Sequence, residues 1–318
     1  MPLPARPRLG VSSCLLGEAV RWDGGHRRDT FLTGTLARFV EWVPVCPEVE
    51  AGMGVPRPTL RLVGDARDPR LVDPASGRDW TEEMRALARR RVTQLQALDL
   101  CGYVLKKDSP SCGMERVKVN EPGTVGRRAG RGLFAAVLME EMPLLPVEEE
   151  GRLGDVTLRE AFLDRVFAYA RWRGFVAGRP RRADLVAFHA RSKFGLLAHS
   201  EPHLRRLGRI VAGAAARRMA DVLDEYGRLY AEAFAQKAGR RSHRNVLEHL
   251  AGFVSDALTR EERAELRETT ADYASGLLPL IVPITLLRHH ARKQGAAYVL
   301  DQAYLSPHPK ELMLRNHV

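Results

Sequence analysis

Residues 8–17 read RLGVSSCLLG, a short apolar run that leads directly into a turn of serine, cysteine and glycine. The same pattern returns at residues 38–46, RFVEWVPVC, and at residues 100–113, LCGYVLKKDSPSCG. A fourth apolar run, LFAAVL, occupies residues 133–138. Short apolar runs bounded by Gly, Pro and Ser are typical of buried strands. The sequence therefore predicts four strands, three of which end in a turn that carries a cysteine.

Between the second and third runs, residues 81–98 have the spacing of an amphipathic helix. Thr81 is a candidate cap for this helix. The apolar residues that recur at helical spacing are Met84, Leu87, Val92, Leu95 and Leu98. Because strands that alternate with helices are typical of a mainly parallel sheet covered by helices, we expect the N-terminal half to be an α/β domain.

Residues 142–151, MPLLPVEEEG, combine two prolines, an acidic run and a glycine, and we interpret them as a linker. Apolar residues beyond this segment recur at helical spacing, as in Leu158, Phe162 and Val166. The prediction is therefore an α/β domain with a mainly parallel sheet at residues 1–148, followed by an all-α domain at residues 149–318.

The formal charge of +11 is distributed unevenly along the 318 residues. Residues 1–150 hold 22 basic and 21 acidic residues, whereas residues 151–318 hold 28 basic and 18 acidic residues. A basic domain suggests a polyanionic partner such as nucleic acid. The basic residues are 43 Arg and only 7 Lys, which can also reflect the base composition of a genome, so charge alone leaves nucleic-acid binding open.

The chain has no stretch near the ~18–20 consecutive apolar residues that a membrane span needs. The best candidate, residues 277–287, is short and contains two prolines, and is expected to be core. The first residues lack the pattern of a secretory signal peptide. We therefore expect a cytoplasmic protein without a membrane partner. In that compartment the four cysteines are expected to be thiols, metal ligands or catalysts instead of disulfides.

Three cysteines, Cys14, Cys46 and Cys112, each follow a predicted strand. Loops at the carboxyl ends of parallel strands gather at one edge of a sheet, so these three thiols are expected to converge. Cys101 lies at the start of its strand and should be at the far end of the sheet. The sequence predicts three convergent thiols and one that stands apart.

Three thiols without C-x-x-C spacing do not suit a structural zinc ion, which normally has four protein ligands. They suit a [4Fe–4S] cluster with one iron left free to bind a substrate. The alternative, that these cysteines are ordinary small buried residues, stays open from spacing alone.

Glu48 and Ser109 lie close in sequence to two of these cysteines. A carboxylate there could move a proton, and a hydroxyl could orient a substrate. The alternatives are that Glu48 pairs with an arginine such as Arg57, and that Ser109 is a turn residue before a proline. Residues 21–26, RWDGGH, could contact a base or phosphate, or could simply form a turn.

Three motifs together resemble the thiouracil desulfidase (TudS-like) family: VSSCLLG at residues 11–17, CPEVEAGMGVPRP at 46–58 and KKDSPSCG at 106–113. The resemblance spans roughly residues 8–145. It implies an iron–sulfur enzyme that removes sulfur from thiolated uracil without net redox chemistry.

This resemblance also implies the roles of individual residues. Cys14, Cys46 and Cys112 would bind a [4Fe–4S] cluster with one iron not ligated by the protein, which takes the substrate sulfur. Glu48 would be the catalytic acid–base group and Ser109 the catalytic hydroxyl that assists it. Cys101 matches no ligand position.

The second half resembles a helical domain of the YbgA type that is often fused behind this desulfidase. The motifs that carry the resemblance are LVAFHARSKFGLLAHS at residues 185–200, NVLEHLAGF at 245–253 and QAYLSPHPKEL at 302–312. Two-domain members of this kind act on 4-thiouridine, as the monophosphate or in tRNA, so the implied partner is a thiolated uracil nucleotide or tRNA.

His189, Lys193 and Ser200 form a candidate face for the phosphate backbone of such a partner. The alternative is that His189 and His199 are polar core or capping residues, and His243 is equally open.

Other function classes remain open from the sequence. A cysteine-nucleophile hydrolase would work without metal, although His26 is the only histidine in the first half to serve as its base. A non-catalytic iron–sulfur protein that binds RNA or regulates, and a structural zinc module, are the others. Iron and acid-labile sulfide content would separate them.

Overall fold

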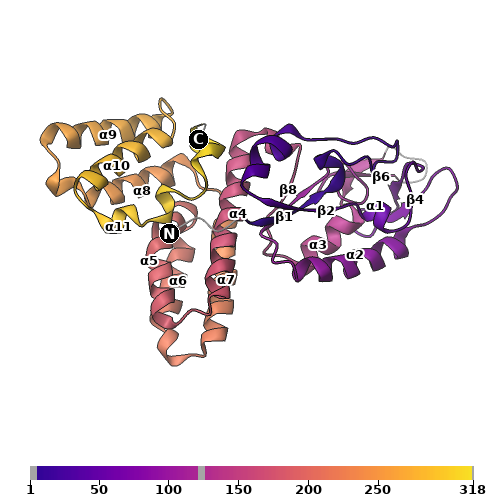
Figure 1. Cartoon of the computed structure of the whole chain (residues 1–318), viewed down its shortest axis with the longest axis horizontal. Helices are drawn as coiled ribbons and strands as arrows, with labels where there is room; N and C mark the ends of the chain where they lie inside the picture. The colour runs from indigo at the N-terminus through magenta and orange to yellow at the C-terminus, as the bar shows by residue number, and fades with distance from the viewer. Residues whose placement is uncertain (1–5, 121–125, 317–318) are drawn as a thin grey trace. The chain divides into compact units, whose positions relative to one another are not determined.

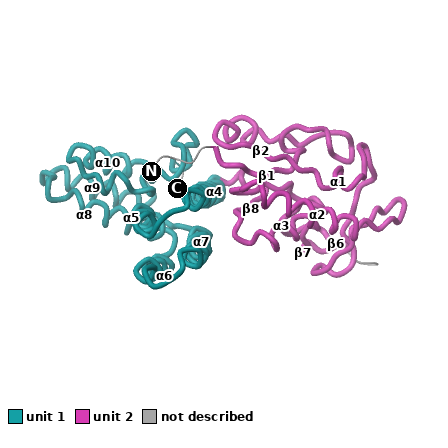
Figure 2. The backbone as a smooth tube through the Cα atoms, turned by 60° about the horizontal axis from the view of Figure 1, so that its bottom comes forward, with its two compact units in different colours: residues 1–4, 156–318 teal, residues 5–155 magenta. Residues whose placement is uncertain are grey.

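The computed structural model describes residues 6–120 and 126–316 (Figure 1). The chain divides into two compact units, one formed by residues 5–155 and the other formed mainly by residues 156–318 (Figure 2). We describe each unit by itself.

The first unit is built around a four-stranded sheet, sheet A, in which every neighbouring pair of strands is parallel. Its strands, in spatial order, are β2 (Glu41–Val45), β1 (Arg8–Ser12), β5 (Gly102–Leu105) and β8 (Val147–Glu149). This confirms the predicted α/β domain with a mainly parallel sheet. Since all four strands run the same way, the loops after β1, β2 and β5 leave the same edge.

A second four-stranded sheet, sheet B, is mixed and was not anticipated from the sequence. Its strands, in spatial order, are β4 (Arg70–Val72), β3 (Arg61–Val63), β6 (Val117–Asn120) and β7 (Arg127–Gly130). The β3–β6 pair is parallel and the two outer pairs are antiparallel.

Two helices lie side by side in this unit, α2 (Thr81–Gln96) and α3 (Leu133–Glu141) (Figure 1). The helix predicted over residues 81–98 is confirmed as α2, which ends at Gln96 so that Leu98 lies beyond it. Its buried apolar residues are Met84, Leu87, Ala88, Val92 and Leu95. Thr81 does not cap it as expected, because its hydroxyl instead accepts a hydrogen bond from the backbone N–H of Leu71 at 2.9 Å.

The strand predicted at residues 133–138 is wrong, since these residues form α3. The first turn of α3 is seated on the loop after β5: the backbone N–H groups of Phe134 and Ala135 donate to the carbonyl of Ser111 at 3.0 and 3.1 Å. Four residues of this helix that point in different directions are buried: Leu133, Phe134, Ala135 and Leu138. The helix is therefore not amphipathic, and its sequence shows no helical periodicity. An apolar run of six residues does not distinguish a buried strand from a buried helix.

The linker predicted at residues 142–151 is also wrong in part, because Val147–Glu149 is the edge strand β8 of sheet A. Its acidic residues are paired instead of solvated. Glu148 Oε1 accepts from Arg152 Nε at 2.7 Å, and Glu149 Oε1 accepts from the backbone N–H of Met114 at 2.7 Å. The division between the two compact units falls after Asp155.

The second unit is helical, as predicted, and its described residues contain no strand. Its helices are α4 (Val156–Ala177), α5 (Arg182–His199), α6 (Glu201–Ala212), α7 (Met219–Ala235), α8 (Arg240–Gly252), α9 (Arg260–Ser275), α10 (Ile281–Lys293) and the short α11 (Ala297–Leu300).

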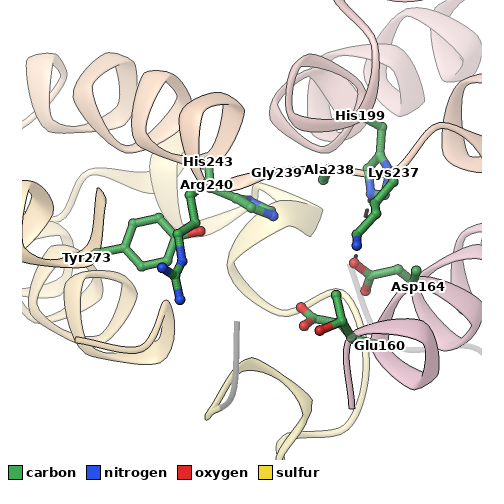
Figure 3. A pocket seen from close by; sticks show the side chains of 11 residues that line it. Glu160, Asp164, His199, Lys237, Ala238, Gly239, Arg240, His243 and Tyr273 are labelled. Carbon is green, nitrogen blue, oxygen red and sulfur yellow. Dashed lines mark ion pairs between the residues drawn. The ribbon is translucent and has the colours of Figure 1, made fainter. Parts of the chain in front are cut away.

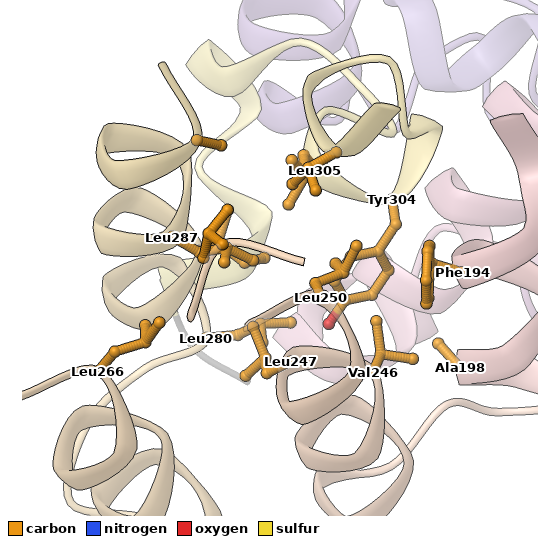
Figure 4. Packing of buried hydrophobic residues seen from close by; sticks show 14 of the residues in the cluster. Phe194, Ala198, Val246, Leu247, Leu250, Leu266, Leu280, Leu287, Tyr304 and Leu305 are labelled. Carbon is orange, nitrogen blue, oxygen red and sulfur yellow. The ribbon is translucent and has the colours of Figure 1, made fainter. Parts of the chain in front are cut away.

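Two apolar clusters hold this unit together. One gathers aromatic rings around Trp172, which stacks on Tyr226 with ring centroids 5.1 Å apart. The other packs Leu250, Leu287 and Tyr304 together (Figure 4). The run at residues 277–287 that we expected to be core is buried at Leu280, Ile284 and Leu287, whereas Leu277 at its start is 73% exposed. Among the described helices, none has the length and apolar content to cross a bilayer.

Candidate functional site

Three cysteines line one cavity of about 390 Å³ at the carboxyl edge of sheet A. Cys14 lies in the single helical turn that follows β1, and Cys46 follows β2 and precedes the four-residue helix α1 (Pro47–Glu50). Cys112 lies in the loop after β5. The structure thus brings together the three thiols of three separate loops. Cys101 directly precedes β5, at the other end of that strand, and does not line the cavity.

Burial dominates the electrostatics of these thiols. It raises the pKa of Cys14 to about 11, raises the pKa of Cys46, and raises that of Cys112 well above its usual range. The neighbouring cysteines add to the effect, because thiolates close together repel one another. A thiolate at this position therefore needs a positively charged centre beside it, which a metal supplies.

The arrangement does not suit a single metal ion. Within residues 6–120 and 126–316, no three His, Cys, Asp or Glu side chains are grouped so that they could hold one ion. The three thiols instead face a common cavity, and no fourth cysteine lines it. Three soft donors spread around a cavity fit a polynuclear iron–sulfur cluster better than a structural zinc ion.

Glu48 lies on α1 and its carboxylate lines the same cavity. Its Oε2 accepts a hydrogen bond from Arg57 Nε at 2.9 Å and forms an ion pair with Nη2 of the same guanidinium. Its Oε1 accepts from Ser111 Oγ at 2.9 Å. The pairing with Arg57 that the sequence left open is therefore present, and both carboxylate oxygens of Glu48 are held in place.

Arg57 is itself fixed by the loops around it. Its side chain is 4% exposed, and Nη1 donates to the carbonyls of Val20 and Gly54, both at 2.9 Å. The guanidinium thus ties Glu48 to the loop that follows Cys14.

Ser109 also lines the cavity, but its hydroxyl oxygen organises the loop. It accepts hydrogen bonds from the backbone N–H groups of Ser111 at 3.2 Å and Cys112 at 3.0 Å. This is the turn role that the sequence left open. The turn is packed tightly against the start of α3, since a Cβ at Gly132 would lie 2.5 Å from the carbonyl of Ser111.

Cationic and aromatic side chains complete the cavity wall. Arg21 and Trp22 come from the RWDGGH segment, Arg27 directly follows it, and Lys106 and Lys107 follow β5. Trp22 is 45% exposed, which is high for a tryptophan. The segment also forms the turn that was its alternative, with Gly25 N donating to Asp23 Oδ1 at 3.0 Å. The two lysines and Ser111 were given no role from the sequence, although all three lie within the motif KKDSPSCG at residues 106–113.

The histidines proposed for the helical unit are mostly interior. His189 Nδ1 lies 3.1 Å from the hydroxyl of Tyr226, and burial lowers the pKa of His189. His243 Nδ1 lies 3.0 Å from the hydroxyl of Tyr304. Ser200 is the residue before α6 and contacts His203 Nδ1 at 2.8 Å. The polar-core alternative thus describes His189 and His243.

Comparisons with known proteins agree with this division of the chain. The family model for 2-thiouracil desulfurase matches residues 9–150, and the model for DUF1722, a family of unknown function, matches residues 193–309.

Each individual relative covers less than half of the chain. Uncharacterized protein YbgA of Escherichia coli (strain K12) is 29% identical over 136 residues, 42% of this chain and 80% of its own length. Uncharacterized protein YbbK of Bacillus subtilis (strain 168) is 29% identical over 135 residues, 41% of this chain and 88% of its own length. A solved structure of a [4Fe-4S]-dependent thiouracil desulfidase, TudS, is 30% identical, with a TM-score of 0.40, and covers 47% of this chain and 94% of that one. The α/β unit that carries the cysteine cavity is a domain of the 2-thiouracil desulfurase family, joined in this chain to a DUF1722 domain.

Proposed function

We propose that this protein removes sulfur from thiolated uracil, acting on 4-thiouridine as the monophosphate or in tRNA, so that uridine remains in the monophosphate or the tRNA and sulfide is released. The observation that carries the proposal is the meeting of Cys14, Cys46 and Cys112 at one cavity in a domain of the 2-thiouracil desulfurase family.

The three cysteines are assigned as ligands of a [4Fe–4S] cluster with one iron not ligated by the protein. The buried Cys14 and Cys112 share a cavity with the half-buried Cys46, and no fourth cysteine lines it, which supports this assignment. When bound, such a cluster supplies a Lewis-acidic iron with affinity for the sulfur of the substrate.

Glu48 is assigned as the group that takes the proton of the water whose oxygen replaces the sulfur. Its carboxylate lines the cavity and is oriented from both sides, by Arg57 and by Ser111. A base held in one geometry does not have to be ordered when the substrate arrives, which favours proton transfer.

Ser109 is assigned as a donor to the uracil base. In both of its hydrogen bonds within the described part of the chain, the hydroxyl oxygen is the acceptor. A hydroxyl also carries one proton to donate, and this proton is left for a substrate oxygen. The same side chain can therefore hold the turn and position the substrate.

The rim of the cavity favours a nucleotide over a free base. Arg27 is exposed, lines the cavity and makes no ion pair within the residues that the structure describes. A guanidinium binds phosphate well, and the exposed ring of Trp22 offers a surface for stacking of a base. The 28 basic residues of the second half, against 18 acidic ones, would suit the backbone of an RNA.

The first test is the iron and acid-labile sulfide content of anaerobically purified protein, with about four of each expected per chain. Sulfide release is then measured with 4-thiouridine monophosphate and with tRNA containing 4-thiouridine. Cys112→Ser should lose both the cluster and the activity, whereas Cys101→Ser, which changes a thiol outside the cavity, should keep both. A Cys112→Ser protein that retained brown colour and activity would overturn the ligand assignment.

The nucleotide preference is tested separately. Arg27→Gln should lower kcat/KM for 4-thiouridine monophosphate by about tenfold, as expected for loss of a charge-assisted hydrogen bond, and leave the free base 4-thiouracil unaffected. Arg89→Gln, an exposed arginine on α2 outside the cavity, is the matched control.

The two rival functions give different results. A cysteine-nucleophile hydrolase would be active without iron, but His26 is exposed and does not line the cavity, which leaves it without a histidine base there. A non-catalytic iron–sulfur protein would bind tRNA and release no sulfide.

A further inference from the structure

The helical unit contains a polar cavity of its own, of about 230 Å³, which no motif of the sequence identified (Figure 3). One wall is the start of α4, and the facing wall is the segment Lys237–Gly239 with the first turn of α8 and Tyr273 of α9. His199, the last residue of α5, closes one end.

The floor of this cavity consists of two buried carboxylates one helical turn apart. Glu160 and Asp164 are each 5% exposed and point from α4 into the cavity (Figure 3). Glu160 Oε2 and Asp164 Oδ1 have no hydrogen-bond partner among the described residues. Leaving such atoms buried and unpaired costs about 1–3 kcal/mol or more each, so the geometry calls for a donor in the cavity.

The neighbours of these carboxylates form ion pairs with them, at distances longer than an ordinary hydrogen bond. Asp164 lies 3.8 Å from His199 Nε2 and 3.6 Å from His308 Nε2, and Glu160 Oε1 lies 3.9 Å from Arg315 Nε. The hydroxyl of Tyr273 is likewise buried and has no hydrogen-bond partner within the described part of the chain.

The wall that faces these carboxylates is positively charged. Lys237 and Arg240 are exposed and line the cavity beside the N-terminal end of α8, which carries a partial positive charge. A single ligand that met both walls would therefore need hydrogen-bond donors at one end and a negative charge at the other.

We propose that this cavity binds a small zwitterion, an α-amino acid, with its ammonium group on Glu160 and Asp164 and its carboxylate on Lys237, Arg240 and the N-terminus of α8. The volume is below the ~300–1,000 Å³ usual for larger ligands, which restricts the occupant to a small one.

Simpler occupants fit less well. A simple cation would be repelled by the positive charges of Lys237 and Arg240. A simple anion would be repelled by the negative charge of Asp164. A metal ion is not favoured either, since the described residues contain no group of three His, Cys, Asp or Glu side chains able to hold one.

Protonation gives the site a measurable signature. Burial and the charge of Asp164 raise the pKa of Glu160 to about 8, so the empty site holds a proton on Glu160 at neutral pH. Asp164 stays charged, because His199, His308 and Arg315 lower its pKa despite its burial. The ammonium group of a ligand favours the ionised form of Glu160, so binding at pH 7 releases a proton.

The test is calorimetry and thermal unfolding of the whole chain with L-alanine, set against ethylammonium and propionate, which each carry one of its two charges. L-alanine should raise Tm and release close to one proton per site at pH 7, seen as a binding enthalpy that changes with the ionisation enthalpy of the buffer. Neither half-ligand should do so at the same concentration. Glycine and L-serine distinguish among amino acids of this size.

Variants test the contribution of each wall of the cavity to binding separately. Glu160→Gln should abolish proton release and weaken binding about tenfold or more, as expected for loss of a charge-assisted hydrogen bond. Arg240→Gln, at an exposed position, should weaken binding and keep proton release, whereas Arg228→Gln, an exposed arginine on α7 outside the cavity, should change neither.

Failure of L-alanine, glycine and L-serine to bind the wild-type protein at millimolar concentration would overturn the proposal. It would mean that the cavity holds only water. Equal binding of L-alanine to the Arg240→Gln and wild-type proteins would overturn the assignment of the carboxylate wall. Neither result bears on the desulfurase site.

Discussion

Ser111 Oγ donates a hydrogen bond of 2.9 Å to Glu48 Oε1, a contact between residues 63 positions apart in the sequence. Ser111 is fully buried, and its carbonyl also receives the first turn of α3. Ser111 therefore connects Glu48, the candidate base, to the loop that carries Cys112, a candidate cluster ligand.

Ser111→Ala should reduce sulfide release about 5–10-fold, because loss of one hydrogen bond of about 1 kcal/mol leaves one oxygen of Glu48 unoriented. Iron content should not change, since the backbone bonds from Phe134 and Ala135 remain. The measurement is kcat with 4-thiouridine monophosphate beside iron content, with Ser255→Ala in the helical unit as control. Loss of iron in Ser111→Ala would mean that the hydroxyl supports the loop instead of the carboxylate.

Arg57→Gln should destabilise the iron-free protein by about 3–5 kcal/mol, because it leaves the carboxylate of Glu48 without its buried partner. Glu48→Gln combined with Arg57→Gln should recover part of this loss, since no uncompensated charge remains. Urea unfolding of the single and double variants measures the coupling. Additive effects in this cycle would show that the pair does not interact in the folded protein.

Gly132→Ala should destabilise the first unit by about 1–3 kcal/mol and lower its iron content, since the new Cβ must displace the backbone of Ser111 and Cys112. Gly154→Ala is the matched control, because no atom of another residue lies within 4 Å of a Cβ at that position. Thermal unfolding and iron analysis of both variants check the expectation. An unaffected Gly132→Ala protein would contradict the tight seating of α3 on the loop.

The stability of the helical unit should fall as pH rises toward 8. The folded protein raises the pKa of Glu160 from 4.5 to about 8, so its contribution is complete below about pH 4.5 and is lost as pH rises through 8. Glu160→Gln cannot ionise, and should gain stability relative to wild type between pH 6.5 and 9.

That window avoids the opposite trend of two buried histidines. Burial lowers the pKa of His243 to about 3 and that of His308 to about 4, so they stabilise the fold above about pH 6.5 and lose this effect only as pH falls. Denaturant unfolding at several pH values, without added ligand, makes the comparison. A constant difference between Glu160→Gln and wild type across the window would contradict the raised pKa.

The parallel sheet was predictable because β1, β2 and β5 each combine an apolar run with a turn of Gly, Pro and Ser. Such local signals do not depend on distant partners. The same reasoning anticipated the helices of the second unit, where apolar residues recur over many turns.

The errors arose where distant residues decide the local structure. Residues 133–138 are helical because their N–H groups meet the loop after β5, and Glu148 and Glu149 enter a strand because Arg152 and Met114 satisfy their carboxylates. Sheet B was missed because its strands are only three or four residues long, and three of them begin with an exposed arginine: Arg61, Arg70 and Arg127.

In the candidate site, the motifs indicated the three cysteines, Glu48 and Ser109, and the structure adds what surrounds them. The pairing of Glu48 with Arg57 could be listed as an alternative, but its second bond, to Ser111, depends on how the chain folds back over 63 positions. The polar cavity of the helical unit had no local signature, since its residues come from five segments.

The position of β8 at the edge of sheet A decides where the chain can be cut. Glu149 binds the backbone N–H of Met114, two residues beyond Cys112, and Glu150 binds the N–H of Lys107 at 2.7 Å. A fragment that ended at residue 148 would remove both anchors of the loop and the last residue of the three-residue edge strand β8. Expression of the desulfurase unit alone should therefore extend through Asp155, so that a colourless fragment is not mistaken for evidence that iron uptake requires the helical half.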